Sequence, residues 1–255
     1  MKGAIIGDIV GSRFEFNNIK SKDFDLFATE SCYTDDTVTT VATMDWLMSG
    51  EPDYAPILRK WCAMYPSPMG AYGAGFVRWL RKKDYAPYGS YGNGSAMRVA
   101  PVGFFGKNEE EVINKAQDSA EITHNHPQGI KGAVSVALAI HLLRDGKSKA
   151  AVKKRIAEDY GYDLSRTCDE IRPGYYFNET CQGTVPEAFI AFFDSTSFED
   201  AIRNAISLGG DSDTLTCITG GLAEAHYGVP ETLWEQAVTV LPQEMLEVIN
   251  RFYGG

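Results

Sequence analysis

Apolar residues recur with the spacing of an α-helix along most of this chain, and this period restricts its fold more than any other feature. Windows in which they fall on one helical face are residues 57–65, 112–120, 133–142 and 201–206. Pro230 and Pro242 suit the first turns of two final helices. No run of alternating apolar and polar residues rich in β-branched side chains is present. We therefore predict an all-α protein of about ten or more helices.

The length and charge of the chain restrict its organisation and its partners. With 255 residues and no linker or internal repeat, it is long enough to bury a full core, and we expect one domain over residues 1–255. A net charge of −10 argues against a broad basic surface for nucleic acid. No apolar run reaches the roughly 18 residues that a membrane span needs. Because no long apolar interface stripe stands out, we expect a monomer without a membrane partner.

The cysteines indicate the cellular compartment. There are five, an odd number, and they are scattered without a Cys-x-x-Cys pair. This pattern argues against a disulfide framework and against a zinc site. The apolar N-terminal run is interrupted by Asp8 and is too short for a secretory signal followed by a cleavage site. We expect a cytoplasmic protein with reduced thiols.

Two acidic clusters carry the strongest chemical signal. The first comprises Thr34, Asp35, Asp36 and Thr37, and it directly precedes apolar residues with helical spacing. One side-chain oxygen is enough to cap a helix, and this segment supplies four consecutive polar side chains. A helix cap and a metal site therefore both remain open for the segment taken alone.

The second cluster, Asp211, Ser212, Asp213 and Thr214, follows a glycine pair and raises the same two alternatives. Its two carboxylates and the threonine hydroxyl form a compact set of oxygen atoms that a single cap does not require. Mg²⁺ and Mn²⁺ prefer such oxygen ligands. If the two clusters meet in the fold, they predict a metal-dependent hydrolase.

Glycine-rich segments are predicted as loops. Gly70–Gly75 and Gly89–Ser95 are too flexible for helix interiors, and Thr167–Gly183 is a further irregular segment. Backbone amides of a glycine loop can surround a phosphate, and Tyr91 could stack on a base. No Gly-Lys-Ser/Thr follows the second loop, so it is not a P-loop.

Several single residues have both a structural and a functional interpretation. His124 and His126 are helix caps or surface residues in one interpretation and contact a ribose or phosphate in the other. Glu15 is a surface charge between two phenylalanines, or it lies near the metals and positions or deprotonates a water. Asp8 is interpreted as a residue that caps or orients a neighbouring element, and His141 as a core histidine.

The ordered set of these motifs resembles the ADP-ribosylglycohydrolase family over nearly the whole chain. The motifs are, in order, GDIVGSRFEF, YTDDT, GSYGNGSAMR, THNHPQG, TVPEAF, SLGGDSDT and GGLAEAHYG. The resemblance implies a compact single-domain orthogonal helical bundle with a binuclear magnesium or manganese site. Residues 89–98 look like the branch that cleaves serine-linked and poly-ADP-ribose. Ser95 departs from the commoner glycine, and the chain is at the small end of the family, which weakens any transfer of acceptor specificity.

The same resemblance implies roles for individual residues. Glu15 matches a glutamate near the metals that helps catalysis or gates substrate entry, and His124 matches a ligand contact. One of Glu15, Asp35 or Asp36 would act as general acid or base. The implied ligands of two Mg²⁺ ions, with Mn²⁺ as the alternative, are Thr34, Asp35, Asp36, Asp211, Asp213 and Thr214. The implied loop that holds the diphosphate and flanks the adenosine consists of Gly89, Ser90, Tyr91, Gly92 and Asn93.

The resemblance implies a metal-dependent hydrolase that cleaves the glycosidic bond between ADP-ribose and an acceptor. The acceptor is an arginine or serine side chain of an ADP-ribosylated protein, or another ADP-ribose conjugate, and the sequence does not distinguish these. One alternative is a non-catalytic ADP-ribose-binding or structural relative, which would usually have lost metal ligands. The other is a phosphohydrolase of nucleotide diphosphates, which would release AMP instead of intact ADP-ribose.

Overall fold

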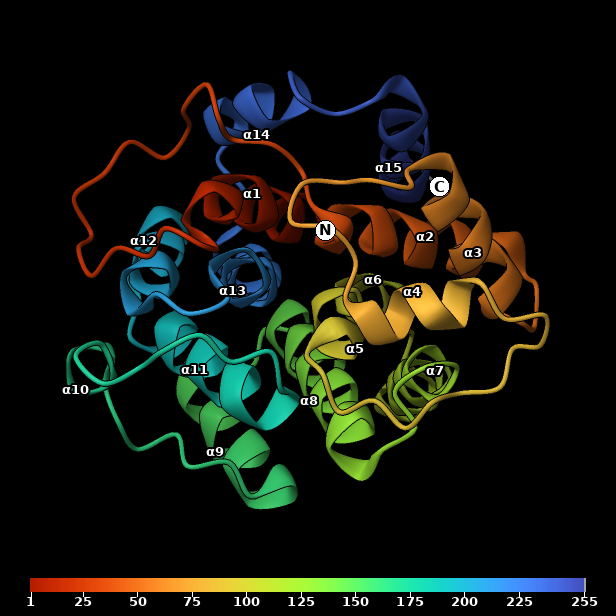
Figure 1. Cartoon of the computed structure of the whole chain (residues 1–255). Helices are drawn as coiled ribbons and strands as arrows, with labels where there is room; N and C mark the ends of the chain where they lie inside the picture. The colour runs from red at the N-terminus through yellow and green to blue at the C-terminus, as the bar shows by residue number, and fades with distance from the viewer. Residues whose placement is uncertain (255) are drawn as a thin grey trace.

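The computed structural model describes residues 1–254, whose regular structure is helical (Figure 1). In this part of the chain the only β pairing consists of two isolated bridges, Thr34 with Met69 and Gly92 with Thr180. The prediction of an all-α protein with ten or more helices is confirmed. The helices are α1 Lys2–Gly11, η1 Ser12–Phe14 (a 3₁₀ helix), α2 Asp35–Ser49, α3 Ala55–Met64, α4 Ala74–Leu80, α5 Gly94–Met97, α6 Ala100–Phe105, α7 Glu109–Glu121, α8 Pro127–Arg144, α9 Lys149–Tyr160, α10 Cys168–Ile171, α11 Cys181–Phe193, α12 Phe198–Leu208, α13 Ser212–Tyr227, α14 Glu231–Val238 and α15 Gln243–Gly254.

All four apolar windows lie in helices, namely α3, α7, α8 and α12. The predictions of three irregular segments are partly wrong, because helices begin inside or at the end of each of them. Residues 74 and 75 start α4, and residues 94 and 95 start α5. Residues 167–183 contain α10 and the first turn of α11, which Thr167 and Thr180 cap by accepting backbone N–H groups. Local capping hydrogen bonds therefore support the starts of α10 and α11, whereas α4 and α5 begin without a side-chain cap.

Helices α1 and α13 pack against each other closely and antiparallel at the centre of the molecule (Figure 1). Three glycines spaced by four residues, Gly3, Gly7 and Gly11, form the contact face of α1. A Cβ atom built on Gly7 would lie 2.1 Å from the carbonyl oxygen of Thr216, so only glycine permits this approach. Backbone contact of this kind fixes the two helices in register.

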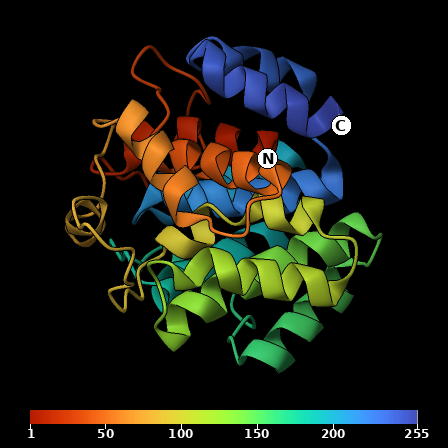
Figure 2. The same cartoon turned by 90° about the vertical axis from the view of Figure 1, so that its right-hand side faces the viewer.

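The remaining helices lie in tiers around this pair (Figure 2). Helices α14 and α15 cover α1 and α2 on one side, and α8 and α9 lie toward the other. Helix α8 is buried at almost every position from Gly132 to Leu143, which places it in the core. No helix within residues 1–254 combines the length and the apolar character that crossing a membrane requires.

The packing brings the N-terminal ends of α2 and α13 together. Thr34 caps α2 by accepting the amide of Asp36 at 3.2 Å. Helix α13 begins after Gly209 and Gly210, both with positive φ, so the chain turns sharply there. Both acidic clusters therefore sit at helix N-termini, where the helix dipole favours negative charge.

Candidate active site

A cavity of about 390 Å³ opens where the two acidic clusters meet. Its walls come from the starts of α2, α4 and α13, the loop before α5, and the loops at residues 15, 124 and 179. Segments far apart in the sequence thus converge on one site. The sequence-predicted residues that line it are Glu15, Asp35, Asp36, Ser90, Gly92, Asn93, His124, Asp211, Asp213 and Thr214.

Three predicted site residues lie outside the lining of the cavity. Thr34 is fully buried, and its hydroxyl donates to the Asp8 carboxylate at 2.7 Å. The amide of Gly89 donates to Asn125 Oδ1 at 2.8 Å, and Tyr91 is half exposed with its ring 5.2 Å from that of His126. Their predicted roles as metal or substrate contacts remain predictions.

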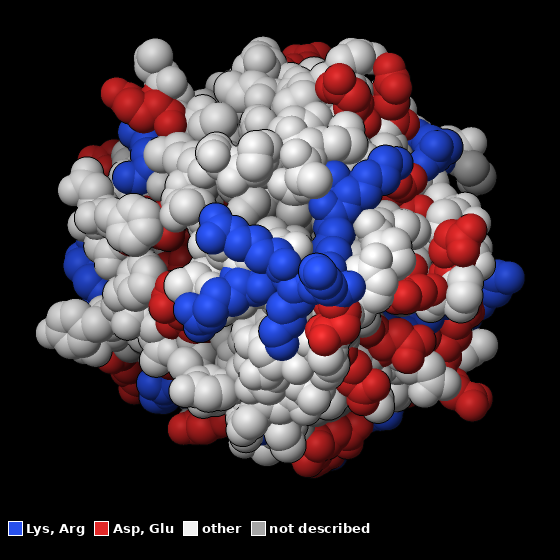
Figure 3. Space-filling view, turned by 45° about the vertical axis from the view of Figure 1, so that its right-hand side comes forward, with Lys and Arg blue, Asp and Glu red and all other residues white. Residues whose placement is uncertain are grey.

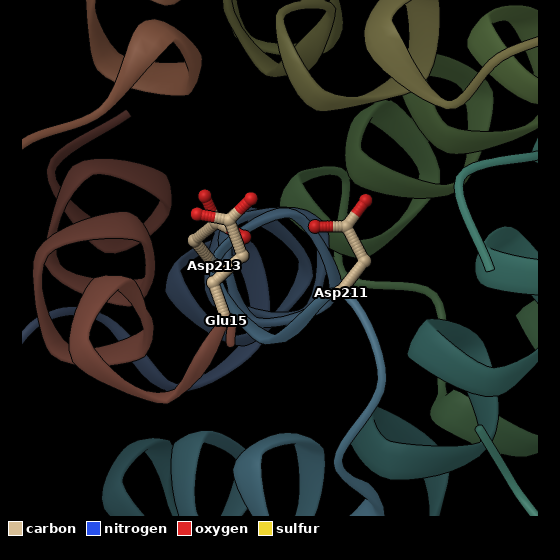
Figure 4. Close-up of side chains that lie close together, drawn as sticks. All are labelled: Glu15, Asp211 and Asp213. Atoms are coloured by element: carbon tan, nitrogen blue, oxygen red, sulfur yellow. The ribbon is translucent and has the colours of Figure 1, made fainter. Parts of the chain in front are cut away.

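Carboxylates from both ends of the chain lie close together in the cavity. Oxygen atoms of Glu15, Asp211 and Asp213 lie within 4.8 Å of one another, and Figure 4 shows the three side chains around one space. Asp36 joins the group because its Oδ2 accepts the hydroxyl of Thr214 at 3.2 Å. The second oxygen of Asp36 and Oδ1 of Asp213 are buried without a hydrogen-bond partner. Buried carboxylate oxygens without partners are costly, and a bound cation would satisfy them.

The charges in this cluster repel one another. Burial, followed by the charge of Asp213, raises the pKa of Asp35 and of Asp36 well above the usual range. Burial and Asp211 do the same to the pKa of Asp213. The pKa of Glu15 rises to about 8 through burial and the neighbouring charges of Asp213, Asp8 and Glu179. Positive charge such as a bound cation would lower these pKa values and favour the ionised carboxylates.

Asp8 holds the first acidic cluster in place. It is buried in α1 and accepts the backbone amides of Thr34 at 3.0 Å and Thr37 at 3.1 Å, together with both threonine hydroxyls. The prediction that Asp8 orients a neighbouring element is thereby confirmed. Its side chain fixes the first turn of α2 and so the direction in which Asp35 and Asp36 project.

Arg98, a buried residue that was not among the predicted site residues, supports His124. Arg98 is almost fully buried and donates to the Ser119 carbonyl at 2.7 Å and to Thr123 Oγ1 at 2.9 Å. The Thr123 hydroxyl in turn pairs with Nδ1 of His124 at 2.7 Å. Burial, with Arg98 nearby, keeps the pKa of His124 well below its usual value, so the imidazole is neutral. Nε2 of His124 faces the glycine loop, 3.2 Å from where a Cβ of Gly94 would lie.

Contacts define structural roles for His126 and His141. His126 is the N-cap of α8, because its Nδ1 accepts the amide of Gln128 at 3.1 Å. His141 is a buried residue of α8 with Nε2 3.5 Å from the carboxylate of Asp145, so the prediction of a core histidine is confirmed.

Asn93 links the glycine loop to the acidic cluster. Its side-chain amide donates to Asp211 Oδ2 at 2.7 Å and to Thr184 Oγ1 at 3.1 Å. Its backbone amide donates to the carbonyl of Glu179 at 2.7 Å. Glu179 and Thr184 were not predicted as site residues, because neither the irregular segment before Thr184 nor the TVPEAF motif that begins there indicates proximity to residues 89–95.

Basic side chains gather on one face of the molecule. Figure 3 shows a band of Lys and Arg over α3, α4 and the turn after α4, with Asp and Glu at its margins. Arg78, Arg81, Lys82 and Lys83 contribute exposed side chains there, and within residues 1–254 none of the four forms an ion pair. The band is bordered by acidic groups, and the expectation that no broad nucleic-acid surface exists remains a prediction.

Fold and site together define an all-α protein with an acidic cavity between two helix N-termini, closed on its other side by a glycine loop. The family model described as ADP-ribosylglycohydrolase matches residues 1–254. The chain therefore belongs to the ADP-ribosylglycohydrolase family, a family of glycohydrolases, and the resemblance seen in the motifs is confirmed.

Individual relatives agree with this assignment. The chain is 28% identical to "ADP-ribosylhydrolase ARH3" of Homo sapiens, with 93% of this chain and 87% of that protein covered. It is 27% identical to "ADP-ribosylarginine hydrolase Tri1" of Pseudomonas putida (strain GB-1), with 96% and 76% covered. A solved structure titled "ADP-ribosylglycohydrolase-related protein complex" superposes with a TM-score of 0.71 at 23% identity, over 98% of this chain and 94% of that one. At that identity the structure shows a shared fold.

Proposed function

We propose that this protein hydrolyses the glycosidic bond between ADP-ribose and an acceptor, releases ADP-ribose and so reverses ADP-ribosylation. The observation that carries the proposal is the convergence of five carboxylates, Glu15, Asp35, Asp36, Asp211 and Asp213, in one cavity. The acceptor is an arginine or serine side chain, or a related conjugate. Family membership indicates the class of reaction. In the cavity we call the part lined by the carboxylates the reactive end, and the part lined by Ser90, Gly92 and Asn93 the binding end.

The reactive end fits two divalent cations, for which we propose Mg²⁺ with Mn²⁺ as the alternative. The residues that would hold them are Thr34, Asp35, Asp36, Asp211, Asp213 and Thr214. The fit rests on the buried oxygens of Asp36 and Asp213 that have no hydrogen-bond partner, and on an oxygen-only donor set. When bound, such cations act as Lewis acids and make a water molecule more acidic at neutral pH.

The chain's own residues bind and orient the substrate at the other end of the cavity. Ser90, Gly92 and Asn93 line it and would hold the diphosphate, with Tyr91 beside the adenosine. The neutral His124 can donate or accept one hydrogen bond to the ligand without adding charge. Because Asn93 also binds Asp211, the position of the diphosphate is tied to that of the carboxylates.

In the reaction, a bond forms between the water oxygen and the anomeric carbon, and the bond from that carbon to the acceptor breaks. One of Glu15, Asp35 or Asp36 takes a proton from water, and the leaving acceptor atom gains one proton. The transition state resembles an oxocarbenium ion, which nearby carboxylates stabilise. Glu15 and Asp35 are the half-buried members of the set, whereas Asp36 is buried, so these two are better placed to exchange a proton with solvent.

Cation binding tests the site without relying on turnover. We expect the protein to bind Mn²⁺ at two sites by electron paramagnetic resonance titration, and Asp213→Asn to weaken that binding about 10- to 100-fold or more. Asp163→Asn is the matched control, because Asp163 lies on the surface and bonds to Ser165 only. Equal Mn²⁺ binding by Asp213→Asn and the parent protein, with both folded by circular dichroism, would reject the assignment.

A further inference from the structure

Exposed aromatic side chains lie on the two segments that contribute Glu15 and Glu179 to the lining of the cavity. Phe16 and Tyr176 are 76% and 73% exposed, the highest values among the large apolar side chains of residues 1–254. Phe16 directly follows Glu15, and the half-exposed Phe177 lies two residues before Glu179. Both glutamates line the cavity. The rings of Phe16 and Phe177 stack with centroids 6.0 Å apart. Clustered apolar groups exposed to water on segments that border a site are candidates for contact with a ligand.

The segment that carries Phe177 is held firmly against the cavity. The carbonyl of Glu179 accepts the amide of Asn93 at 2.7 Å, and the amide of Cys181 donates to the Tyr91 carbonyl at 2.9 Å. On the other side, Nζ of Lys20 donates to the Tyr175 carbonyl at 2.6 Å. Phe177 and Glu179 therefore have fixed positions relative to the carboxylate cluster, and the stacked pair joins two loops across the rim.

The chemistry of this rim favours a planar cation. Glu179 is exposed and forms no ion pair within the described residues, and Glu15 lies close enough for the two charges to interact. Aromatic faces beside carboxylates attract a guanidinium, which stacks on the ring and donates two N–H bonds to a carboxylate. The ammonium group of Lys20, which donates to the carbonyl of Tyr175 in this segment, is engaged by main-chain carbonyls. A hydroxyl acceptor such as serine would leave both the rings and the Glu179 carboxylate without a partner.

We propose, on the basis of the proposed function, that Phe16, Phe177 and Glu179 form an acceptor subsite that selects arginine-linked ADP-ribose. The guanidinium stacks on the exposed phenylalanine face and hydrogen-bonds to Glu179, while the ribose lies over the carboxylate cluster. Hydrolysis then breaks the bond between the anomeric carbon and the guanidinium nitrogen, and the nitrogen leaves with the proton that it gains from water.

The test compares kcat/KM for ADP-ribosyl-arginine with kcat/KM for a serine-ADP-ribosylated peptide, both with Mg²⁺. We expect the parent protein to prefer the arginine linkage. Phe16→Leu, Phe177→Leu and Glu179→Gln should each lower kcat/KM for the arginine substrate about three- to tenfold. Their effect on the serine substrate should stay within about twofold. Phe16→Tyr keeps the aromatic face and should retain the preference for the arginine substrate. Met64→Ala is the control, because it removes an exposed apolar side chain elsewhere, on α3.

Two results would overturn the proposed subsite. One is a parent protein that prefers the serine linkage, and the other is a set of variants that lower kcat/KM for both substrates by the same factor. Release of ADP-ribose from neither substrate would contradict the proposed function instead. In that event, binding of agmatine to the protein in the presence of ADP-ribose, measured by calorimetry, still decides the subsite. Agmatine binding that is lost in Phe16→Leu and Glu179→Gln supports it, and binding that does not change in these variants rejects it.

Discussion

At the scale of single residues, Asp8 shows how one buried carboxylate organises a site that it does not line. In the sequence it interrupts an apolar run, and in the fold it accepts four hydrogen bonds from Thr34 and Thr37. Burial raises its pKa to about 6, against the lowering effect of those hydrogen bonds. In the first turn of α2 the amide of Thr37 has no acceptor within the helix, and the Asp8 carboxylate supplies one.

The raised pKa values predict how stability depends on pH. Asp213 and Glu15 have higher pKa values in the folded protein than in the unfolded chain, so the folded state binds more protons between about pH 4 and 8. The contribution of these two groups to the free energy of unfolding is therefore fully present below pH 4 and is lost as the pH rises toward 8. Cations bind the ionised carboxylates, so Mg²⁺ should stabilise more at pH 8 than at pH 5.

Differential scanning calorimetry with chelator, and again with Mg²⁺, measures this dependence. Each 1 kcal/mol lost between pH 5 and pH 8 corresponds to a decrease in Tm of about 2–4 °C. Asp213→Asn removes one of the repelling charges, so its Tm should change less with pH than that of the parent protein. The two proteins are compared with chelator present. If the Tm of the parent protein increased from pH 5 to pH 8 relative to the Tm of Asp213→Asn, the electrostatic account would be contradicted.

At the scale of elements, the contact between α1 and α13 determines the site. The glycines of α1 bring its backbone against α13, and this register places Glu15 beside Asp211 and Asp213. Main-chain contact over several turns leaves little freedom for the helices to slide. The site therefore depends on residues that carry no chemical group of their own.

Replacing Gly7 by alanine tests this contact. The new Cβ would lie 2.1–2.9 Å from main-chain atoms of Thr216 and Cys217. Because these atoms belong to the backbone of α13, the clash can be relieved only if the two helices move apart. We expect a loss of about 2–3 kcal/mol in the free energy of unfolding, by urea denaturation, despite the better helix propensity of alanine. Gly174→Ala is the control, because no atom lies within 4 Å of its Cβ position. A Gly7→Ala protein as stable as the parent would show that the helices are not in close contact.

At the scale of the whole molecule, the helical period and the ordered motifs were enough to predict the all-α class and the family. Long helices such as α3 and α8 follow directly from apolar spacing, because burial of one face or of the whole helix decides them. The short helices α5 and α10 were missed, since four residues are too few for a periodic pattern; α10 is held by a capping box and α5 by its packing against α8 and α13.

The site was predictable in part for a similar reason. Residues that carry carboxylates in a motif, such as Asp36 and Asp213, can be selected from their chemistry. Arg98 and Glu179 could not, because their importance comes from which segments the fold brings together. Thr34 was predicted as a metal ligand from its motif, but the hydrogen bond that its hydroxyl donates to Asp8 could not be predicted from the sequence.

The central claim is that the protein cleaves the glycosidic bond of an ADP-ribose conjugate, and product analysis by liquid chromatography and mass spectrometry tests it most directly. The protein is incubated with arginine-linked and serine-linked substrates, with Mg²⁺ and separately with chelator. We predict intact ADP-ribose and unmodified acceptor from at least one substrate, and loss of both products with chelator. AMP as the product would indicate a phosphohydrolase, and no product from protein that binds cations would indicate a non-catalytic relative; either result would contradict the claim.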